Sequence, residues 1–317
     1  YDAPYVPGWD CHGLPIELQV EKKLGKKRRE LSQSEFRAMC REYAKEQIDI
    51  QKDDFIRLGV FGDWENRYAS LDYSFEGEAI NGFARIYHNG HVEKGSKPVH
   101  WCLECSSALA EAEVEYMDKT SSSIDVKFAF TKDSAKELKK RLGNKTDDQI
   151  HVVIWTTTPW TIPGNQAVCF KPDIGYEVLK VDGEFLLVAS ELKEQCSERW
   201  SDKKVSSTKI KLKGSDLEDL ILKHPLFDRE SPLYAADHVT TETGTGFVHT
   251  APAHGVDDYN ICSKEGLAIE NPVLANGCYK EDVEYFSGMH VRKVDPEVIS
   301  KLKEFNALIN HGEYFHS

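Results

Sequence analysis

The sequence predicts an α/β protein in which a mainly helical first part is followed by a β-rich, barrel-like domain with flanking helices. Apolar residues in roughly the first hundred positions recur at helical spacing. After Lys97 the pattern changes, because Ile124, Val126 and Phe128 alternate with polar residues as they do in a strand. These two periodicities define the fold class.

Two long helices are expected in the first part. Ser32 and Glu35 stand at capping-box spacing and begin the first helix, which Gly59 can end. The second helix follows Ser74 and carries Ile80, Phe83 and Tyr87 on one face, and residues 89–90 (Asn-Gly) supply a stop signal.

Short strands with interspersed helices are expected in the β-rich part. The predicted strands are 150–155, 176–181, 185–188 and 210–212, and the predicted helices lie near 135–142, 255–265 and 295–305. We divide the chain into a helical part (1–95), a connector (96–115), a β-rich domain (116–295) and a return connector (296–317).

Size and composition agree with this division. The 317 residues exceed the usual length of one domain, so two or three units are expected. With 40% hydrophobic and 29% charged residues the chain resembles an ordinary globular protein. No apolar run approaches the roughly 18 residues of a membrane helix, so we expect no membrane partner. The absence of an initiator Met indicates a chain cut from a longer protein.

Charge and cysteine content narrow the class of partners and the compartment. The formal net charge of -13 argues against a general nucleic-acid binder, so any RNA contact is expected to be local. Eight cysteines are too few for a disulfide scaffold. We therefore expect a protein of the reducing cytoplasm, and we take a monomer as the starting expectation.

The stretch from Pro7 to Glu17 gathers an indole, two carboxylates and an imidazole between glycines and prolines. A loop of this composition can place polar groups around a small ligand without the constraints of a helix or strand. A structural turn around a partly buried Trp9 is the alternative explanation. Within this stretch Asp10 is the candidate ligand-binding residue.

Cys102 and Cys105 present two thiols at the spacing of a tetrahedral zinc site. Two thiols are half of a structural site, and the remaining cysteines form no second such pair. Zinc is therefore a candidate cofactor with an incomplete ligand set.

A run of hydroxyls follows the predicted strand 150–155. Thr156, Thr157 and Thr158 stand between Trp155 and Pro159, and Asn165 follows shortly after. The hydroxyls could serve water, a ribose or an ester carbonyl. A strand end whose threonines are chosen for β propensity is the alternative.

The last motif runs from Gly244 to Tyr259. Its Gly-x-Gly is too weak for a nucleotide-binding fingerprint, because no GxGxxG follows. His249 precedes Asp258 by nine residues, with a Pro-bearing turn between them and a helix expected to start near Gly255. This arrangement could bring an imidazole and a carboxylate into one cleft.

Taken together, these motifs resemble the isoleucyl-tRNA synthetase family. The Gly-Trp-Asp run, the segment after Cys105 (SSALAEAEVEY), the Thr-rich run and the His-to-Asp segment all match, so the resemblance covers the length of the chain. It implies that residues 1–95 are part of a class I Rossmann-type catalytic domain. The β-rich domain would be the inserted editing domain, also called the connective peptide.

The resemblance also implies roles for individual residues. The position of Asp258 binds the α-amino group of a misattached amino acid, Thr156, Thr157 and Thr158 are the hydrolytic and specificity positions, and Asn165 and His249 line the pocket. Asp10 would contact the amino acid of the synthetic site. We take as catalytic candidates Thr156, Thr157, Thr158, His249 and Asp258, and as substrate-binding candidates Trp155, Asn165, His254, Asp257 and Asp10.

The implied function is hydrolysis of the ester of mischarged Val-tRNA(Ile), with tRNA(Ile) and its aminoacylated 3′ end as partner. One methylene distinguishes isoleucine from valine and is worth ~1–3 kcal/mol in an apolar pocket, a limit for which isoleucyl-tRNA synthetase is itself the standard example. A second, smaller pocket would exclude the larger ester, with His249 or a threonine setting the limit. Editing itself would need no cofactor.

The mechanism expected from these groups is an attack by water without a covalent intermediate. Asp258 would be ionised and anchor the ammonium group, while threonine hydroxyls and backbone N–H groups orient water and stabilise the oxyanion. The sequence lacks His-x-Gly-His and Lys-Met-Ser-Lys-Ser, so the use of ATP and magnesium in aminoacylation is expected only of a full-length parent.

Two other classes of function stay open from the residues. A metal-dependent hydrolase could use a metal held by His249, His254, Asp257 and Asp258 to activate its water. The chain could also be a catalytically silent tRNA-binding or structural piece.

Overall fold

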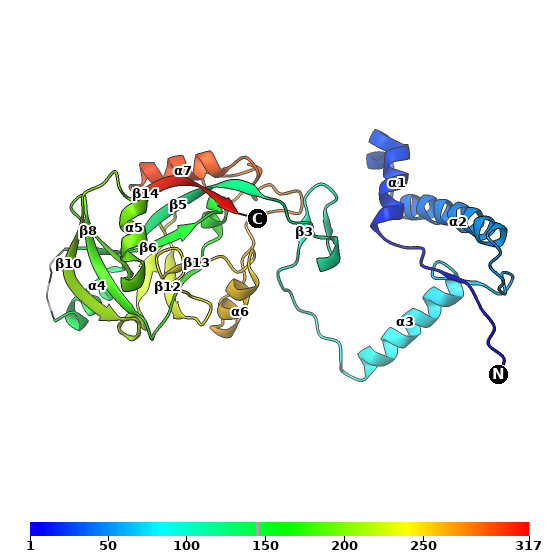
Figure 1. The fold of residues 1–317 in the computed structure, drawn as a ribbon, viewed down its shortest axis with the longest axis horizontal. Helices are drawn as coiled ribbons and strands as arrows, with labels where there is room; N and C mark the ends of the chain where they lie inside the picture. The colour runs from blue at the N-terminus through cyan, green and yellow to red at the C-terminus, as the bar shows by residue number, and fades with distance from the viewer. Residues whose placement is uncertain (144–145, 147, 317) are drawn as a thin grey trace. The chain divides into compact units, whose positions relative to one another are not determined.

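The computed structural model describes residues 1–143, 146 and 148–316. The chain divides into two compact units, Tyr1–Gly95 and Ser96–Ser317. Their elements can be followed by colour in Figure 1. None of the described helices combines the length and the apolar character that crossing a membrane requires.

The first unit is mainly helical, as predicted. It contains β1 (Gly8–Trp9), α1 (Leu14–Leu24), η1 (Gly25–Glu30), α2 (Gln33–Arg57), β2 (Tyr68–Ala69) and α3 (Tyr73–His88). Both predicted long helices are confirmed. The capping box at the start of α2 is complete, because Ser32 Oγ accepts from Glu35 N (3.3 Å) and Glu35 Oε2 accepts from Ser32 N (2.8 Å).

The prediction that residues 7–17 lack helix and strand is wrong. β1 pairs in parallel with β2, and α1 begins at Leu14 with a proline in its first turn. Proline is well suited to a helix start, because its missing N–H would be unpaired there in any case. Gly13 precedes the helix at φ 108°, a conformation that favours glycine.

The second unit is β-rich with flanking helices, as predicted, and it contains two larger sheets. The six-stranded sheet has the order β10-β8-β9-β6-β5-β14, and the four-stranded sheet has the order β11-β12-β7-β13. The larger sheet consists of β5 (Lys119–Ala129), β6 (Ile150–Thr156), β8 (Gly175–Val181), β9 (Glu184–Ala189), β10 (Val205–Lys213) and β14 (Leu308–His316).

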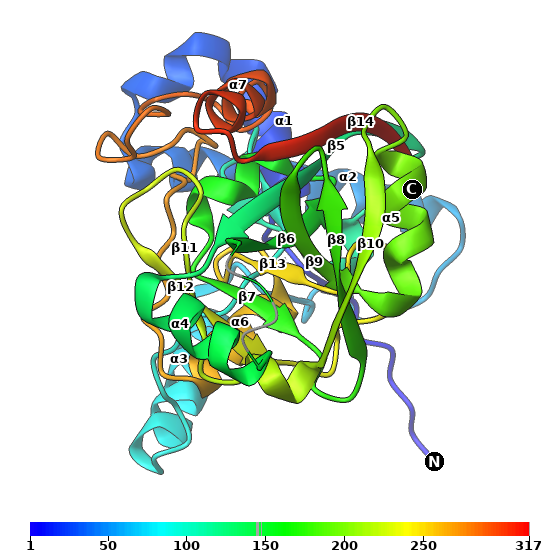
Figure 2. The same cartoon turned by 90° about the vertical axis from the view of Figure 1, so that its left-hand side faces the viewer.

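The smaller sheet consists of β7 (Ala167–Phe170), β11 (Ile221–Lys223), β12 (Glu230–Ala235) and β13 (Val248–Thr250). β13 lies against β6, and Figure 2 shows both strands in the middle of the unit. A separate short hairpin pairs β3 (Trp101–Cys102) with β4 (Ser107–Ala108). In the order of the larger sheet, β10 and β14 are the two edge strands, and that sheet is open.

The helical segments of the second unit are short, and they lie between and after the strands. The α-helices are α4 (Lys132–Arg141), α5 (Lys193–Arg199), α6 (Val256–Lys264) and α7 (Asp295–Glu304). The 3-10 turns are η2 (Glu111–Glu113), η3 (Pro159–Gly164), η4 (Ser190–Leu192) and η5 (Gly214–Leu217). Of these four α-helices, α5 was not predicted from the sequence.

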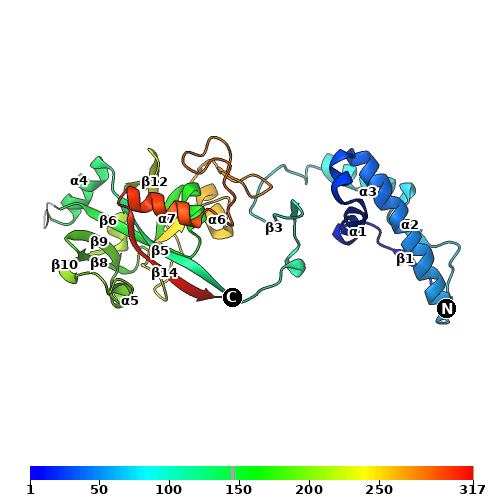
Figure 3. The ribbon, with the colours of Figure 1, turned by 90° about the horizontal axis from the view of Figure 1, so that it is seen from above.

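The segment 296–317, expected as a return connector, forms most of α7 and all of β14. β14 pairs antiparallel with β5, and α7 contacts both strands (Figure 3). This segment is thus built into the larger sheet of the second unit.

The alternation of apolar and polar residues predicted β5, and residues 123–128 are buried throughout, the polar ones included. The polar members are paired: Asp125 accepts from Arg199 Nη2 (3.0 Å), and Lys127 Nζ donates to Glu184 (2.5 Å). Burying unpaired charges would be costly, so these ion pairs allow both faces of β5 to be buried. The core of the unit contains large, fully buried side chains, among them Trp200, Tyr176, Tyr279, Phe128, Phe170 and Phe286.

Candidate active site

The Thr-rich run lies where β6 ends and the turn η3 begins. Thr156 is the last residue of β6, and Thr158 directly precedes η3. Thr156 Oγ1 accepts from Thr158 N (3.1 Å) and lies 3.0 Å from Thr158 Oγ1. Thr157 is half-buried and its hydroxyl has no hydrogen-bond partner among the described residues. Hydroxyls are therefore concentrated at one strand end.

A chain of hydrogen bonds, buried at its His249 end, connects this strand end to His249 on β13. Thr161 Oγ1 lies 3.3 Å from Thr158 Oγ1 and 3.0 Å from His249 Nε2. On the other side of the ring, Asn165 Nδ2 donates to His249 Nδ1 (2.8 Å). Residues separated by 84 to 88 positions in the sequence thus meet in one network.

One assignment of protons satisfies the whole chain. Thr161 donates its single hydroxyl proton to Thr158 O (2.8 Å), so its oxygen accepts from Thr158 and from His249 Nε2. His249 Nδ1 then accepts from Asn165, whose Oδ1 accepts from Ser231 Oγ (2.7 Å). The imidazole is neutral in this assignment, with its proton on Nε2.

Electrostatics agree with a neutral imidazole. Burial lowers the pKa of His249 to about 3, and the charges of His254 and Arg229 act in the same direction. Burial also lowers the pKa of His254 to about 4. Because both nitrogens of His249 are engaged, that residue has no lone pair left for a metal ion.

Asp258 lies near the start of α6, and it is not a member of the hydrogen-bonded chain. Its Oδ2 accepts from Ala251 N (3.0 Å), two residues after His249. Burial raises the pKa of Asp258, an effect opposed by the hydrogen bond from Ala251 and by the charge of His238. A Cβ at Gly255 would come within 2.9 Å of the Asp258 carboxylate, so a larger residue at this position would displace that carboxylate. The neighbouring Asp257 is exposed.

Trp155 and His254 line two different cavities. Trp155 lines a cavity of about 520 Å³ together with Tyr314 and Arg199. His254 lines another cavity, of about 550 Å³, together with Trp160, and the two rings meet edge to face at 4.9 Å. In each of these two side chains a buried ring nitrogen, Trp155 Nε1 or His254 Nε2, lacks a partner among the described residues.

The turn η3 is held by four side chains that sequence reasoning missed. Tyr279 Oη donates to Trp160 O, and Asp295 Oδ1 accepts from Trp160 N (3.0 Å). Two further bonds reach the end of the turn, from His224 Nε2 to Ile162 O (3.0 Å) and from Arg229 Nη2 to Pro163 O (2.6 Å). These contacts span 62 to 135 residues, so local spacing gave no signal for them.

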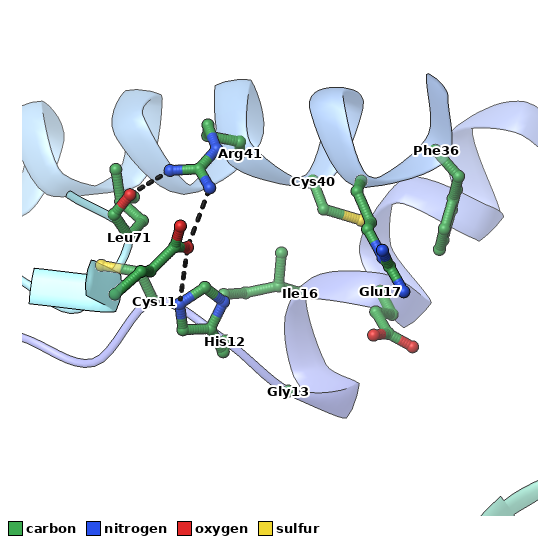
Figure 4. A pocket seen from close by; sticks show the side chains of 11 residues that line it. Cys11, His12, Gly13, Ile16, Glu17, Phe36, Cys40, Arg41 and Leu71 are labelled. Carbon is green, nitrogen blue, oxygen red and sulfur yellow. Dashed lines mark hydrogen bonds and ion pairs between the residues drawn. The ribbon is translucent and has the colours of Figure 1, made fainter. Parts of the chain in front are cut away.

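Asp10 belongs to the first unit. It is exposed and accepts one hydrogen bond, from Ser70 Oγ (3.2 Å). A cavity of about 310 Å³ in the same unit is lined by Cys11 and His12 but not by Asp10. Figure 4 shows Arg41 in this cavity, with a hydrogen bond to Leu71 O. Arg41 Nη2 also lies 2.8 Å from Glu76 Oε1. The predicted amino-acid contact thus remains a prediction.

Cys102 ends β3, and Cys105 lies in the turn between β3 and β4. Cys105 N donates to Cys102 Sγ (3.4 Å), which lowers the pKa of the Cys102 thiol. Over the described ranges, no group of three or more His, Cys, Asp or Glu side chains is arranged to hold a metal ion. The two thiols fall short of the four ligands of a structural zinc site.

Comparisons with known proteins agree with the motifs. The family model for tRNA synthetases class I (I, L, M and V) matches residues 1–310. Isoleucine–tRNA ligases of Idiomarina loihiensis, Shewanella oneidensis and Legionella pneumophila are 48%, 49% and 49% identical to this chain over its whole length. The chain spans about a third (34%) of the length of each of these relatives.

Solved structures of leucyl-tRNA synthetase editing domains are more distant. The editing domain of the cytosolic leucyl-tRNA synthetase of P. knowlesi is 12% identical, with a TM-score of 0.47. The match covers 63% of this chain and 98% of that one. The P. falciparum domain is 11% identical, with a TM-score of 0.43, and the match covers 62% of this chain and 99% of that one.

Proposed function

We propose that the second unit of this chain, which belongs to the class I tRNA synthetase family, edits mischarged tRNA(Ile) by hydrolysing the valyl ester. The observation that carries the proposal is the hydrogen-bonded chain from Thr156 through Thr158 and Thr161 to His249 and Asn165. Aminoacylation with ATP and magnesium would belong to the longer relatives.

The proton assignment distinguishes the roles of the three adjacent threonines. Thr158 donates inward to Thr161, and Thr156 donates to Thr158, so both protons are committed. Thr157 alone of the three has an uncommitted hydroxyl. It is therefore the donor we assign to the developing oxyanion or to the attacking water, a contact that typically contributes ~3 kcal/mol to transition-state stabilisation.

In this proposal His249 positions Thr161 and Thr158 and does not act as a base. Its pKa of about 3 and its two occupied nitrogens leave it unable to take a proton from water near neutral pH. Its ring fixes Thr161, and through Thr161 the hydroxyl of Thr158. A rigid wall of this kind is what a size filter between valine and isoleucine needs.

Asp258 is the proposed anchor for the α-ammonium group. Its burial raises its pKa, so an incoming ammonium would stabilise the carboxylate and be bound in return. Oδ2 is held by Ala251 N, which leaves Oδ1 for the ligand. Trp155, His254 and Asp257 are assigned to the surroundings of the substrate.

The metal-dependent alternative is disfavoured by geometry. His249 would have to give up Thr161 or Asn165 to bind a metal, and each is a buried hydrogen bond whose loss costs about 1–3 kcal/mol. Deacylation that persists after chelation would exclude this alternative, and deacylation that is lost would support it.

The test is deacylation of Val-tRNA(Ile) and Ile-tRNA(Ile) by the chain. We expect hydrolysis of the valyl ester only, and loss of that hydrolysis in Asp258→Ala. Asp173→Ala is the matched control, because Asp173 is exposed. If the valyl ester is hydrolysed no faster than in buffer, the chain is a silent binding piece; if Asp258→Ala retains full activity, the anchor assignment is wrong.

A further inference from the structure

The backbone of Trp160, in the turn η3, is held from outside the turn at both of its polar groups. Tyr279 Oη donates to Trp160 O, and Asp295 Oδ1 accepts from Trp160 N (3.0 Å). The two side chains stand 119 and 135 residues further along the chain. One residue of the turn is thus fixed by two distant elements.

The sequence of the turn explains why Trp160 needs these partners. In a 3-10 turn each backbone oxygen accepts from the N–H three residues later, and the first N–H groups have no partner within the turn. Three residues after Trp160 stands Pro163, which has no N–H to donate. The first bond of the turn runs from Thr161 N to Thr158 O (3.0 Å), so the N–H of Trp160 lies before it. Neither polar group of Trp160 therefore has a regular partner in the turn, and the two distant side chains supply one.

Both distant side chains belong to well-packed parts of the second unit. Tyr279 is 1% exposed, and its backbone N donates to Met289 O (2.9 Å). Asp295 is in the first turn of α7, which buries Val298 and Leu302 completely and contacts β5 and β14 of the larger sheet. Anchors that are themselves fixed by packing hold a neighbouring turn in one position.

The turn carries this position into the candidate active site. Thr161 follows Trp160 directly, and its Oγ1 lies 3.0 Å from His249 Nε2. The Trp160 ring meets the His254 ring edge to face, with 4.9 Å between the ring centroids. A shift of the Trp160 backbone would therefore move both the hydroxyl that fixes His249 and the indole that lies against His254.

Tyr279 and Asp295 act on this site from behind. Neither side chain lines any of the five cavities described in this structure. Burial raises the pKa of Tyr279, so its hydroxyl stays protonated at neutral pH and remains a donor. The two side chains thus reach the site through Trp160 and not by contact with a ligand.

We propose that Tyr279 and Asp295 are positioning residues that, by holding Trp160, set the size of the ester that the site hydrolyses. They do so by fixing the spacing between the turn η3 and the imidazoles of His249 and His254. The inference rests on the proposed function for the reaction itself, hydrolysis of the valyl ester. One methylene in an apolar pocket gives about 10- to 200-fold discrimination, and a wall that yields by the size of a methylene loses it.

The first test compares two replacements of Asp295 in deacylation of Val-tRNA(Ile) and Ile-tRNA(Ile) by the chain. Asp295→Leu removes the acceptor of the Trp160 N–H, and the ratio of kcat/KM for the valyl ester to that for the isoleucyl ester should fall by about 10-fold. Asp295→Asn keeps a side-chain oxygen as acceptor and should retain the ratio within about 2-fold. Asp216→Leu is the matched control, because Asp216 is also half-buried and accepts from a backbone N–H, that of Lys213 (2.9 Å). This control should leave the ratio unchanged.

Tyr279→Phe tests the second bond with a smaller change. It removes one hydroxyl and should lower the same ratio by about 5-fold, the effect of one lost hydrogen bond. Because both bonds hold one residue, Tyr279→Phe combined with Asp295→Leu should lower the ratio by less than the product of the two single effects. Should Asp295→Leu fail to fold, Tyr279→Phe decides alone.

A purely structural role would slow the hydrolysis of both esters by the same factor. The proposal is therefore overturned by an unchanged ratio in Asp295→Leu and Tyr279→Phe. An equal fall of the ratio in Asp295→Asn or in Asp216→Leu would overturn it as well.

Hydrogen exchange at the Trp160 amide, followed by NMR, tests the hold on the turn without any substrate. Exchange should be slow in the unchanged chain and in Asp295→Asn, and at least about 10-fold faster in Asp295→Leu. Equal exchange in the three proteins would also overturn the proposal. If the unchanged chain shows the expected exchange but hydrolyses no valyl ester, the proposed function fails and the hold on Trp160 stands. If the valyl ester is hydrolysed selectively and the variants keep the ratio, the positioning role fails alone.

Discussion

The two units hold their candidate ligand-binding side chains in different ways. In the first unit Asp10 is exposed and receives one hydrogen bond, from Ser70. In the second unit Asn165 is fully buried and His249 is 8% exposed, and the polar side-chain atoms of both are paired. Both motifs had suggested ligand binding from residue types alone. The difference teaches that a motif becomes a preorganised site where buried contacts pair all the polar atoms of its side chains.

The largest effect is expected when Asn165, the centre of the buried hydrogen-bond network, is replaced. Asn165→Leu keeps the approximate size and leaves His249 Nδ1, Ala167 O and Ser231 Oγ without their partner. We expect a loss of about 3 kcal/mol in the free energy of unfolding, from about 1 kcal/mol or more for each group. That corresponds to a fall in Tm of roughly 6–12 °C. Thermal unfolding and deacylation are both measured.

The control for this variant lies in the other unit. Asp10→Asn disturbs one exposed contact, so its Tm should stay within about 2 °C of the unchanged chain. Equal destabilisation by the two variants would contradict the contrast between the units.

The second prediction concerns pH. Burial lowers the pKa of His249 to about 3 and of His254 to about 4, so between those values and about 6.5 the unfolded chain binds more protons than the folded one. Stability should therefore fall as pH falls through this window, by at most about 1.4 kcal/mol per pH unit for each histidine. Burial raises the pKa of Asp258 and of Asp295, which act in the opposite sense.

The measurement compares the units directly. The histidines of the first unit, His12, His88 and His91, are exposed. Hydrogen exchange at decreasing pH should thus show β13 and β6 losing protection before α2 does. His249→Gln should reduce the pH slope of unfolding in urea. An unchanged slope would show that His249 is not the group that titrates.

Local patterns predicted much of this molecule. The capping box of Ser32 and Glu35, the stop at residues 89–90 and the strands 150–155 and 176–181 follow from neighbouring residues, and the structure confirms them. The partners of the site did not follow. Tyr279 and Asp295 reach Trp160 across 119 and 135 residues, and no periodicity encodes such pairs.

The partial failures have the same physical origin. Asp125 and Lys127 are the polar members of the alternation in β5, but α5 and β9 supply Arg199 and Glu184 and allow both to be buried. In the first unit, α1 was missed because a stretch rich in glycine and proline was interpreted as a loop. In each case a long-range partner or a helix-start proline outweighed the local pattern.

The smallest expected effect lies on α3, whose predicted apolar face is present and uncovered. Ile80, Phe83 and Tyr87 are 69%, 58% and 59% exposed, and α3 has no buried residue. Phe83→Gln should change the free energy of unfolding by no more than about 0.5 kcal/mol, because the ring contributes little to the core of this chain.

The control variant is Phe128→Gln, which places an amide at a fully buried position and should cost about 3 kcal/mol or more. Exposed apolar faces favour association, so Phe83→Gln should also reduce light scattering at high concentration. A large loss of stability in Phe83→Gln would mean that this chain buries the face in solution, and the contrast between a fixed second unit and an open first unit would no longer hold.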